Sequence, residues 1–180
     1  MGETGELIFG LKTRVKELEV TLGEYRLAFM KVNDYQGAGK IAESLKWYDE
    51  AASDYCQDTD FASAGRVAEK AGLINDACVY YARAGLGKKA DELSAKYDAV
   101  HAQMSEIKPI PQDLTKGCIN GRTEHECHRA KVKLAIENGL YFDAIELESE
   151  LGFDMKALII AKEHGLTVQA KKLEERLGIK

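Results

Sequence analysis

The sequence has very little proline and almost no sign of β-structure. Only two of its 180 residues are proline, Pro109 and Pro111, so a helix is permitted nearly everywhere else. We find no run of alternating β-branched residues, and the Asn-Gly pair at Asn120-Gly121 lies in a polar stretch rather than between two strand-like runs. These absences predict an all-α protein.

Several functional classes also lack their signatures. The sequence contains no Gly-rich phosphate loop, no H-E-x-x-H motif and no nucleophile elbow, so we expect neither catalysis nor a cofactor. No apolar run approaches the roughly 18 residues of a membrane span, and the acidic N-terminal sequence is unlike a secretory signal. The four cysteines are irregularly spaced, which is not the pattern of a disulfide framework. We therefore expect a cytoplasmic protein with no membrane partner.

The charge is acidic, with a formal net value of −5 at pH 7. Neither half of the chain carries a basic excess, so we expect no nucleic-acid partner. Helix-turn-helix DNA binding is the least favoured alternative. Such a motif needs apolar residues six and nine positions after its glycine. Gly72, with Cys78 and Tyr81, meets this requirement, whereas Gly139 and Gly165 each have a charged residue in at least one of the two positions.

A short phrase, Gly followed by a large apolar residue, recurs every 13 residues in two blocks. These glycines are Gly72 and Gly85 in the first block, and Gly139, Gly152, Gly165 and Gly178 in the second. Alanines follow the same 13-residue spacing: Ala77, Ala90, Ala144, Ala157 and Ala170 each lie five residues after one of these glycines, and Ala38, Ala51 and Ala64 extend the series toward the N-terminus. Glycine can end a helix in the left-handed conformation without a steric penalty, and helices of about ten residues need neighbours to be stable. The pattern predicts a stack of short helices, an α-solenoid.

Residues from about 58 to 91 resemble a tetratricopeptide repeat. The match rests on Phe61, Gly65, Gly72, Ile74, Ala77, Tyr81 and Ala84, with Lys89 where that family has proline. The short helices are also similar to those of soluble NSF attachment proteins and clathrin-type coat proteins. The resemblance implies a right-handed α-α superhelix and a role in binding. On it we expect a non-catalytic protein–protein interaction or scaffold module that takes a protein or peptide partner.

The first predicted helix, about residues 6–33, is longer than the others. Apolar residues follow an unbroken 3-4 spacing along it: Ile8, Leu11, Val15, Leu18, Leu22, Tyr25, Phe29 and Val32. Such a heptad seam can pack on the helices that follow it or pair with a second copy. We expect homo-oligomers through this helix or through an apolar C-terminal end formed by Leu173, Leu177 and Ile179.

We expect one elongated domain, 1–180, made of sub-blocks 1–104, 105–122 and 123–180. A second helix should start after Gly37 and Gly39 and carry its apolar stripe from Ala38 to Tyr55. A helix that ends at residue 71 and has Asp58 or Asp60 as its N-cap should come next. Further helices are expected at residues 73–84, 86–104, 123–138, 140–151, 153–164 and 166–177. The 105–122 segment holds both prolines and should be a loop, and a capping box of Thr123 and Glu126 should start the helix after it.

Two sets of candidate site residues remain. Cys118, His125, Cys127 and His128 are thiol and imidazole side chains within eleven residues, so a zinc-dependent structural module is the main alternative function. Their C-x6-H-x-C-H spacing is not a recognised zinc pattern, and exposed cap histidines with a buried loop cysteine are the favoured explanation of the cluster. The candidate partner-binding residues are the off-stripe aromatics Trp47 and Tyr80, with Asn75, Arg83 and Lys88 beside them.

Overall fold

The computed structural model describes residues 3–108 and 124–179, with side chains from residue 13 onward, and this part of the chain is all-α. It contains ten helices and no strand. The helices are α1 Glu3–Lys31, α2 Tyr35–Ser44, α3 Tyr48–Gln57, α4 Phe61–Ala71, α5 Ile74–Arg83, α6 Gly87–Glu106, α7 Glu124–Glu137, α8 Tyr141–Glu150, α9 Asp154–Glu163 and α10 Thr167–Leu177. No helix in these residues is long and apolar enough to cross a membrane.

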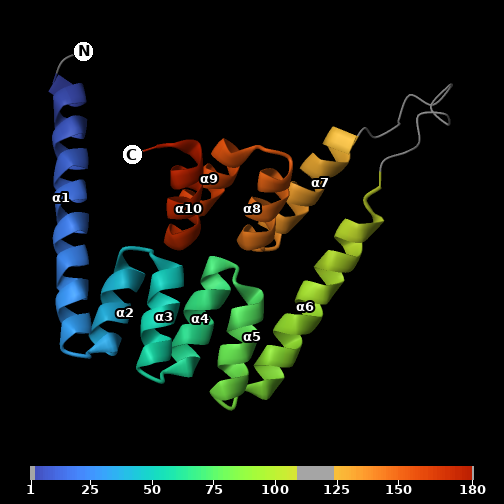
Figure 1. Cartoon of the computed structure of the whole chain (residues 1–180), viewed down its shortest axis with the longest axis horizontal. Coiled ribbons are helices and arrows are strands. Elements are labelled where there is room, and N and C mark those ends of the chain that lie inside the picture. Colours follow the sequence, from blue (N-terminus) through green and yellow to red (C-terminus); the bar gives the residue numbers. More distant parts are fainter. Residues whose placement is uncertain (1–2, 109–123, 180) are drawn as a thin grey trace.

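The helices form two rows of antiparallel neighbours (Figure 1). Helices α1–α6 make the first row and α7–α10 the second, and within each row a helix packs mainly on the helices next to it in sequence. The chain turns back after α6, so that α10 contacts α3 and α7 contacts α6. The two rows therefore run in opposite directions, with the second laid along one edge of the first.

The turns repeat with a period of 13 residues along each row. One residue in each turn has a positive φ: Asn33, Lys46, Thr59, Gly72 and Gly85 in the first row, and Gly139, Gly152, Gly165 and Gly178 in the second. The predicted glycine turns are all confirmed. Three turns of the same kind use residues other than glycine, which the glycine pattern cannot reveal.

The prediction of one helix carrying the stripe from Ala38 to Tyr55 is wrong. The chain breaks at Lys46, whose φ is 61°, and α2 and α3 are separate helices. Gly37 and Gly39 were expected to precede the helix but lie inside α2. Their missing side chains make room for aromatic rings instead: a Cβ on Gly39 would lie 3.1 Å from the Tyr55 ring. The other predicted helices are present with ends within about three residues of the predicted ones.

The N-cap at Asp60 is confirmed, because its carboxylate accepts the backbone N–H of Ser63 at 3.1 Å. The capping residue Thr123 and most of the predicted 105–122 loop lie outside the described residues. Helix α6 itself continues to Glu106, two residues past its predicted end.

One packing arrangement occurs twice in the first row, 26 residues apart. The Tyr55 ring packs on Gly39 and its hydroxyl donates to Glu43 at 3.3 Å. Tyr81 packs in the same way on Gly65 and donates to Glu69 at 2.7 Å. Each member of the second set lies 26 residues after its counterpart, so the same glycine–tyrosine–glutamate arrangement joins α2 to α3 and α4 to α5.

The main core lies at the junction of the rows. It joins buried side chains of the first row, including Ile74 and Val100, to those of the second, including Leu140 and Leu166. A second core, rich in alanine, lies within the first row. Two turns from each row meet at the junction, since the Tyr48 N–H donates to the Gly165 carbonyl at 3.0 Å and Gly72 lies against Gly139.

Candidate functional site

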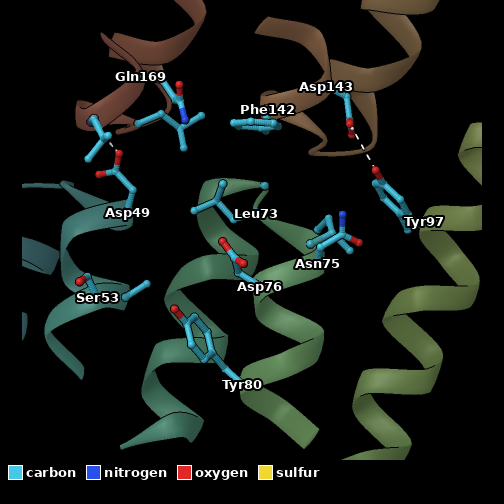
Figure 2. Close-up of a pocket in the computed structure, with 15 residues that line it drawn as sticks. Asp49, Ser53, Leu73, Asn75, Asp76, Tyr80, Tyr97, Phe142, Asp143 and Gln169 are labelled. Carbon is cyan, nitrogen blue, oxygen red and sulfur yellow. Dashed lines mark hydrogen bonds between the residues drawn. The ribbon is translucent and has the colours of Figure 1, made fainter. Parts of the chain in front are cut away.

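A cleft of about 490 Å³ opens where the two rows meet (Figure 2). Its lining comes from α3, the α4–α5 turn, α5 and α6 of the first row and from α8 and α10 of the second. The lining residues are Asp49, Ala52, Ser53, Gly72, Leu73, Ile74, Asn75, Asp76, Tyr80, Tyr97, Phe142, Asp143, Leu166, Val168 and Gln169. Successive turns, 13 residues apart, lie at opposite edges of each row. Only every second turn therefore faces the other row, and this leaves space for the cleft.

One side of the cleft is fixed by a helix cap supplied from the other row. Asp49 of α3 accepts the Thr167 hydroxyl at 2.8 Å and the Val168 backbone N–H at 2.7 Å. The N-cap of α10, Leu166, makes no side-chain cap bond, so Asp49 satisfies a first-turn N–H that α10 cannot satisfy itself. Its negative charge also interacts favourably with the positive end of the helix dipole.

The opposite side is organised by Asp143, at the start of α8. Its carboxylate accepts the Tyr97 hydroxyl at 3.3 Å, and His101 lies 3.5 Å from the other oxygen. Burial, followed by the charge of Asp143, raises the pKa of Tyr97 above its ordinary value. Burial, Asp143 and Glu150 also raise the pKa of the neighbouring Glu146.

Asp76 completes the acidic lining. It lies in the first turn of α5 and is exposed, and Figure 2 shows its carboxylate below Leu73, with Asn75 to its right. Of the fifteen lining residues, three are aspartates and none is lysine or arginine. Apolar surface from Leu73 and Phe142 lies between these carboxylates. This combination suits a ligand that carries both a positive charge and an apolar group.

The structure brings two of the five predicted partner-binding residues into this cleft. Asn75 and Tyr80 line it, and burial, followed by Cys56, raises the pKa of the Tyr80 hydroxyl. The other three residues lie elsewhere. Trp47 is half-buried, with its ring against Gly23 of α1.

The remaining pair of predicted residues is on the surface. Arg83 is exposed, with its guanidinium 5.6 Å from the Phe61 ring centroid. Lys88 is exposed near the start of α6. The five residues thus form no common surface.

Sequence reasoning missed Asp49, Asp76 and Asp143. A signal was available, because Asp76 and Asp143 each follow a turn glycine by four residues, at Gly72 and Gly139. That equivalence places both carboxylates in the first turn of a helix. It does not reveal that the two turns meet in space.

The predicted metal-binding segment is described only in part, since Cys118 lies outside the described residues. His125 is exposed near Phe153, and Cys127 is buried with a free thiol. His128 is largely buried beside Glu148, with 3.7 Å between Nε2 and Oε2. Across the parts of the chain that the structure describes, no group of three or more His, Cys, Asp or Glu side chains is placed to share a metal ion.

Comparisons with protein-family models, with curated proteins and with solved structures each find no match to this chain. Function must therefore be inferred from the geometry of the molecule itself.

Proposed function

We propose that this chain is a non-catalytic protein-interaction scaffold, built as a tetratricopeptide-like right-handed α-solenoid that folds back on itself. We further propose that the cleft between its two rows binds a basic segment of a partner protein with apolar residues beside the basic ones. The observation that carries the proposal is the lining of the cleft: three aspartates around apolar and aromatic surface, without a lysine or arginine among the lining residues.

The hydrogen bonds of the lining support a preformed site. Asp49 and Asp143 are held by partners from other helices, so their carboxylates need little reordering when a ligand arrives. Asp76 is exposed and faces the same space. A lysine or arginine side chain between Asp76 and Asp143 would gain charge-assisted hydrogen bonds, and its apolar neighbours would cover Leu73 and Phe142.

The test uses two labelled peptides of equal length that differ only in charge, one alternating leucine with lysine and the other leucine with glutamate. Fluorescence anisotropy at about 0.1 M salt should show binding of the basic peptide only. Asp76→Asn should weaken this binding about 10- to 100-fold, which corresponds to one charge-assisted hydrogen bond. Asp91→Asn, an exposed aspartate of α6 outside the cleft, is the matched control and should change nothing.

Equal binding of the two peptides would contradict the proposal, and so would equal effects of the two aspartate variants. Phe142→Ala tests the apolar part of the site, because it leaves all three carboxylates in place. It should also weaken the basic peptide.

A further inference from the structure

A second feature, separate from the cleft, points to a partner of a different kind. Helix α1 packs mainly on α2, and it contacts α3 only near its C-terminal end. There Arg26 pairs with Glu50 and Asp54, and Gly23 lies against Trp47. Residues 13–21 are all exposed, and the upper part of α1 projects beyond α2 in Figure 1.

Helix α1 exposes large apolar side chains both in this segment and farther toward its C-terminal end. The exposed fraction is 54% for Val15, 61% for Leu18, 57% for Tyr25 and 72% for Val32. An isolated helical segment of this length is only marginally stable in water. An apolar seam of this size on a protein surface usually marks an interface.

The order of residues along the seam identifies the occupant. In heptad notation the a positions are Ile8, Val15, Leu22 and Phe29, and the d positions are Leu11, Leu18, Tyr25 and Val32. The first two heptads place a β-branched residue at a and leucine at d. That arrangement favours two parallel strands over three or four.

The flanking charges agree with a parallel pair of identical helices. In parallel coiled coils a g residue faces the following e residue of the partner helix. Here Arg14 is at g and Glu19 is at the following e position, so the pair forms twice, once on each side. In an antiparallel pair Arg14 would face another g position, and the remaining g residues, Leu7, Thr21 and Ala28, include no acid.

We propose that a second copy of this chain binds along α1 as a parallel, in-register, two-stranded coiled coil over residues 8–32. Arg26 and Gly23 face the first row of their own subunit, whereas Leu18, Tyr25 and Val32 remain exposed beside them. Leu22 is half-buried and the Phe29 ring lies against Gly37 of α2. Each subunit therefore keeps its own α1–α2 packing, and in this part of α1 the two copies meet about the two-fold axis mainly through the d residues Tyr25 and Val32. An interface through the C-terminal end would bury little further apolar surface, because Leu173 is already buried within the chain. Of the three residues predicted to form that end, only Ile179 is well exposed.

Sedimentation equilibrium of the full chain should show a monomer–dimer equilibrium. Leu18→Glu introduces two charges into the seam and should weaken dimerisation by more than about 100-fold. Val20→Glu is the matched control, since Val20 is 60% exposed on the same helix but occupies the outer f position. It should leave the dimer unchanged, and circular dichroism of both variants verifies that each is folded.

Orientation is tested with single cysteines at two d positions. Leu18→Cys and Tyr25→Cys should each form an interchain disulfide under mild oxidation, read on non-reducing gels against the wild-type chain, which supplies the background from native cysteines. An antiparallel pair can bring at most one of these positions next to its own copy. Arg14→Glu should weaken the dimer, and the double variant Arg14→Glu with Glu19→Arg should restore it.

A monomer at all concentrations up to several hundred micromolar would overturn the proposal. So would equal effects of Leu18→Glu and Val20→Glu, or crosslinking at only one of the two cysteine positions. None of these results depends on the basic-peptide cleft, so the two proposals stand or fall separately.

Discussion

Replacing Gly72 by alanine tests whether the two rows are held together by contact between their turns. Gly72 has a φ of 74° and Gly85 has a φ of 75°, and each is followed by leucine at the end of a first-row helix. Their surroundings differ. A Cβ on Gly72 would lie 2.5 Å from the Gly139 carbonyl oxygen and 2.7 Å from the Tyr141 backbone nitrogen, whereas a Cβ on Gly85 would have nothing within 4 Å.

The two substitutions therefore share one cost and differ in another. Alanine in the left-handed conformation costs about 1–2 kcal/mol at either position. At Gly72 the added methyl group also overlaps backbone atoms of the second row, which can move only if the row moves. Overpacking of this kind costs about 1–3 kcal/mol. We expect Gly85→Ala to lose about 1–2 kcal/mol of unfolding free energy and Gly72→Ala to lose about 2–5 kcal/mol.

Urea unfolding followed by far-UV circular dichroism measures both variants against the wild type. The result that would refute this reasoning is an equal loss of stability in the two variants, because the clash with Gly139 would then be absent. Gly165→Ala and Gly152→Ala repeat the comparison at the other contact. A Cβ on Gly165 would overlap the Lys46 carbonyl oxygen, and one on Gly152 would meet nothing.

Two further predictions concern packing and charge within the first row. Gly65→Ala should cost about 1–3 kcal/mol, because its Cβ would lie 2.8 Å from the buried Tyr81 ring, and Tyr81→Leu in the same chain should recover part of this loss in thermal unfolding. Hydrogen bonding from Arg66 is the main reason that the pKa of Glu43 falls from 4.5 to about 2, so its contribution to stability is present above pH 4.5 and is lost as the pH falls toward 2. Glu43→Gln should therefore be less stable than the wild type by about 1 kcal/mol at pH 7, with a difference in melting temperature that shrinks across that window; a constant difference would contradict the assignment.

Most of the helices could be predicted because turn chemistry is local. Glycine is the residue that most easily adopts a positive φ, so six of the nine positive-φ turns could be read directly. The turns at Asn33, Lys46 and Thr59 carry no such signal. Lysine and threonine are seldom found in this conformation, and here the packed helices on both sides must stabilise it.

The alanine series could have located the missed turn at Lys46. The turns at Asn33 and Thr59 fall where the first predicted helix ends and where the helix capped by Asp58 or Asp60 begins. Ala38, Ala51 and Ala64 each lie five residues after a positive-φ residue, as Ala77 does after Gly72. All four alanines are fully buried, because a neighbouring helix crosses each helix at this point. The buried alanine therefore marks each repeat of the 13-residue spacing more regularly than the residue with positive φ does.

The cleft could not be predicted in the same way. Its three aspartates come from α3, α5 and α8, and no local rule states which turns of one row face which turns of the other. Only the tertiary contacts, such as the Tyr48–Gly165 hydrogen bond, determine that relation.

The matched spacing of the two contacts between the rows restricts how this chain can change in length. Lys46 and Gly72 are 26 residues apart, and so are their respective neighbours in the other row, Gly165 and Gly139. A gene duplication or deletion that added or removed one helix pair between these points in a single row would leave each helix able to fold, yet the two contacts could no longer form together. Helix pairs between the Lys46–Gly165 contact and the Gly72–Gly139 contact must therefore be added or removed in both rows at once. Helix pairs outside the segment between these two contacts could be added without this restriction.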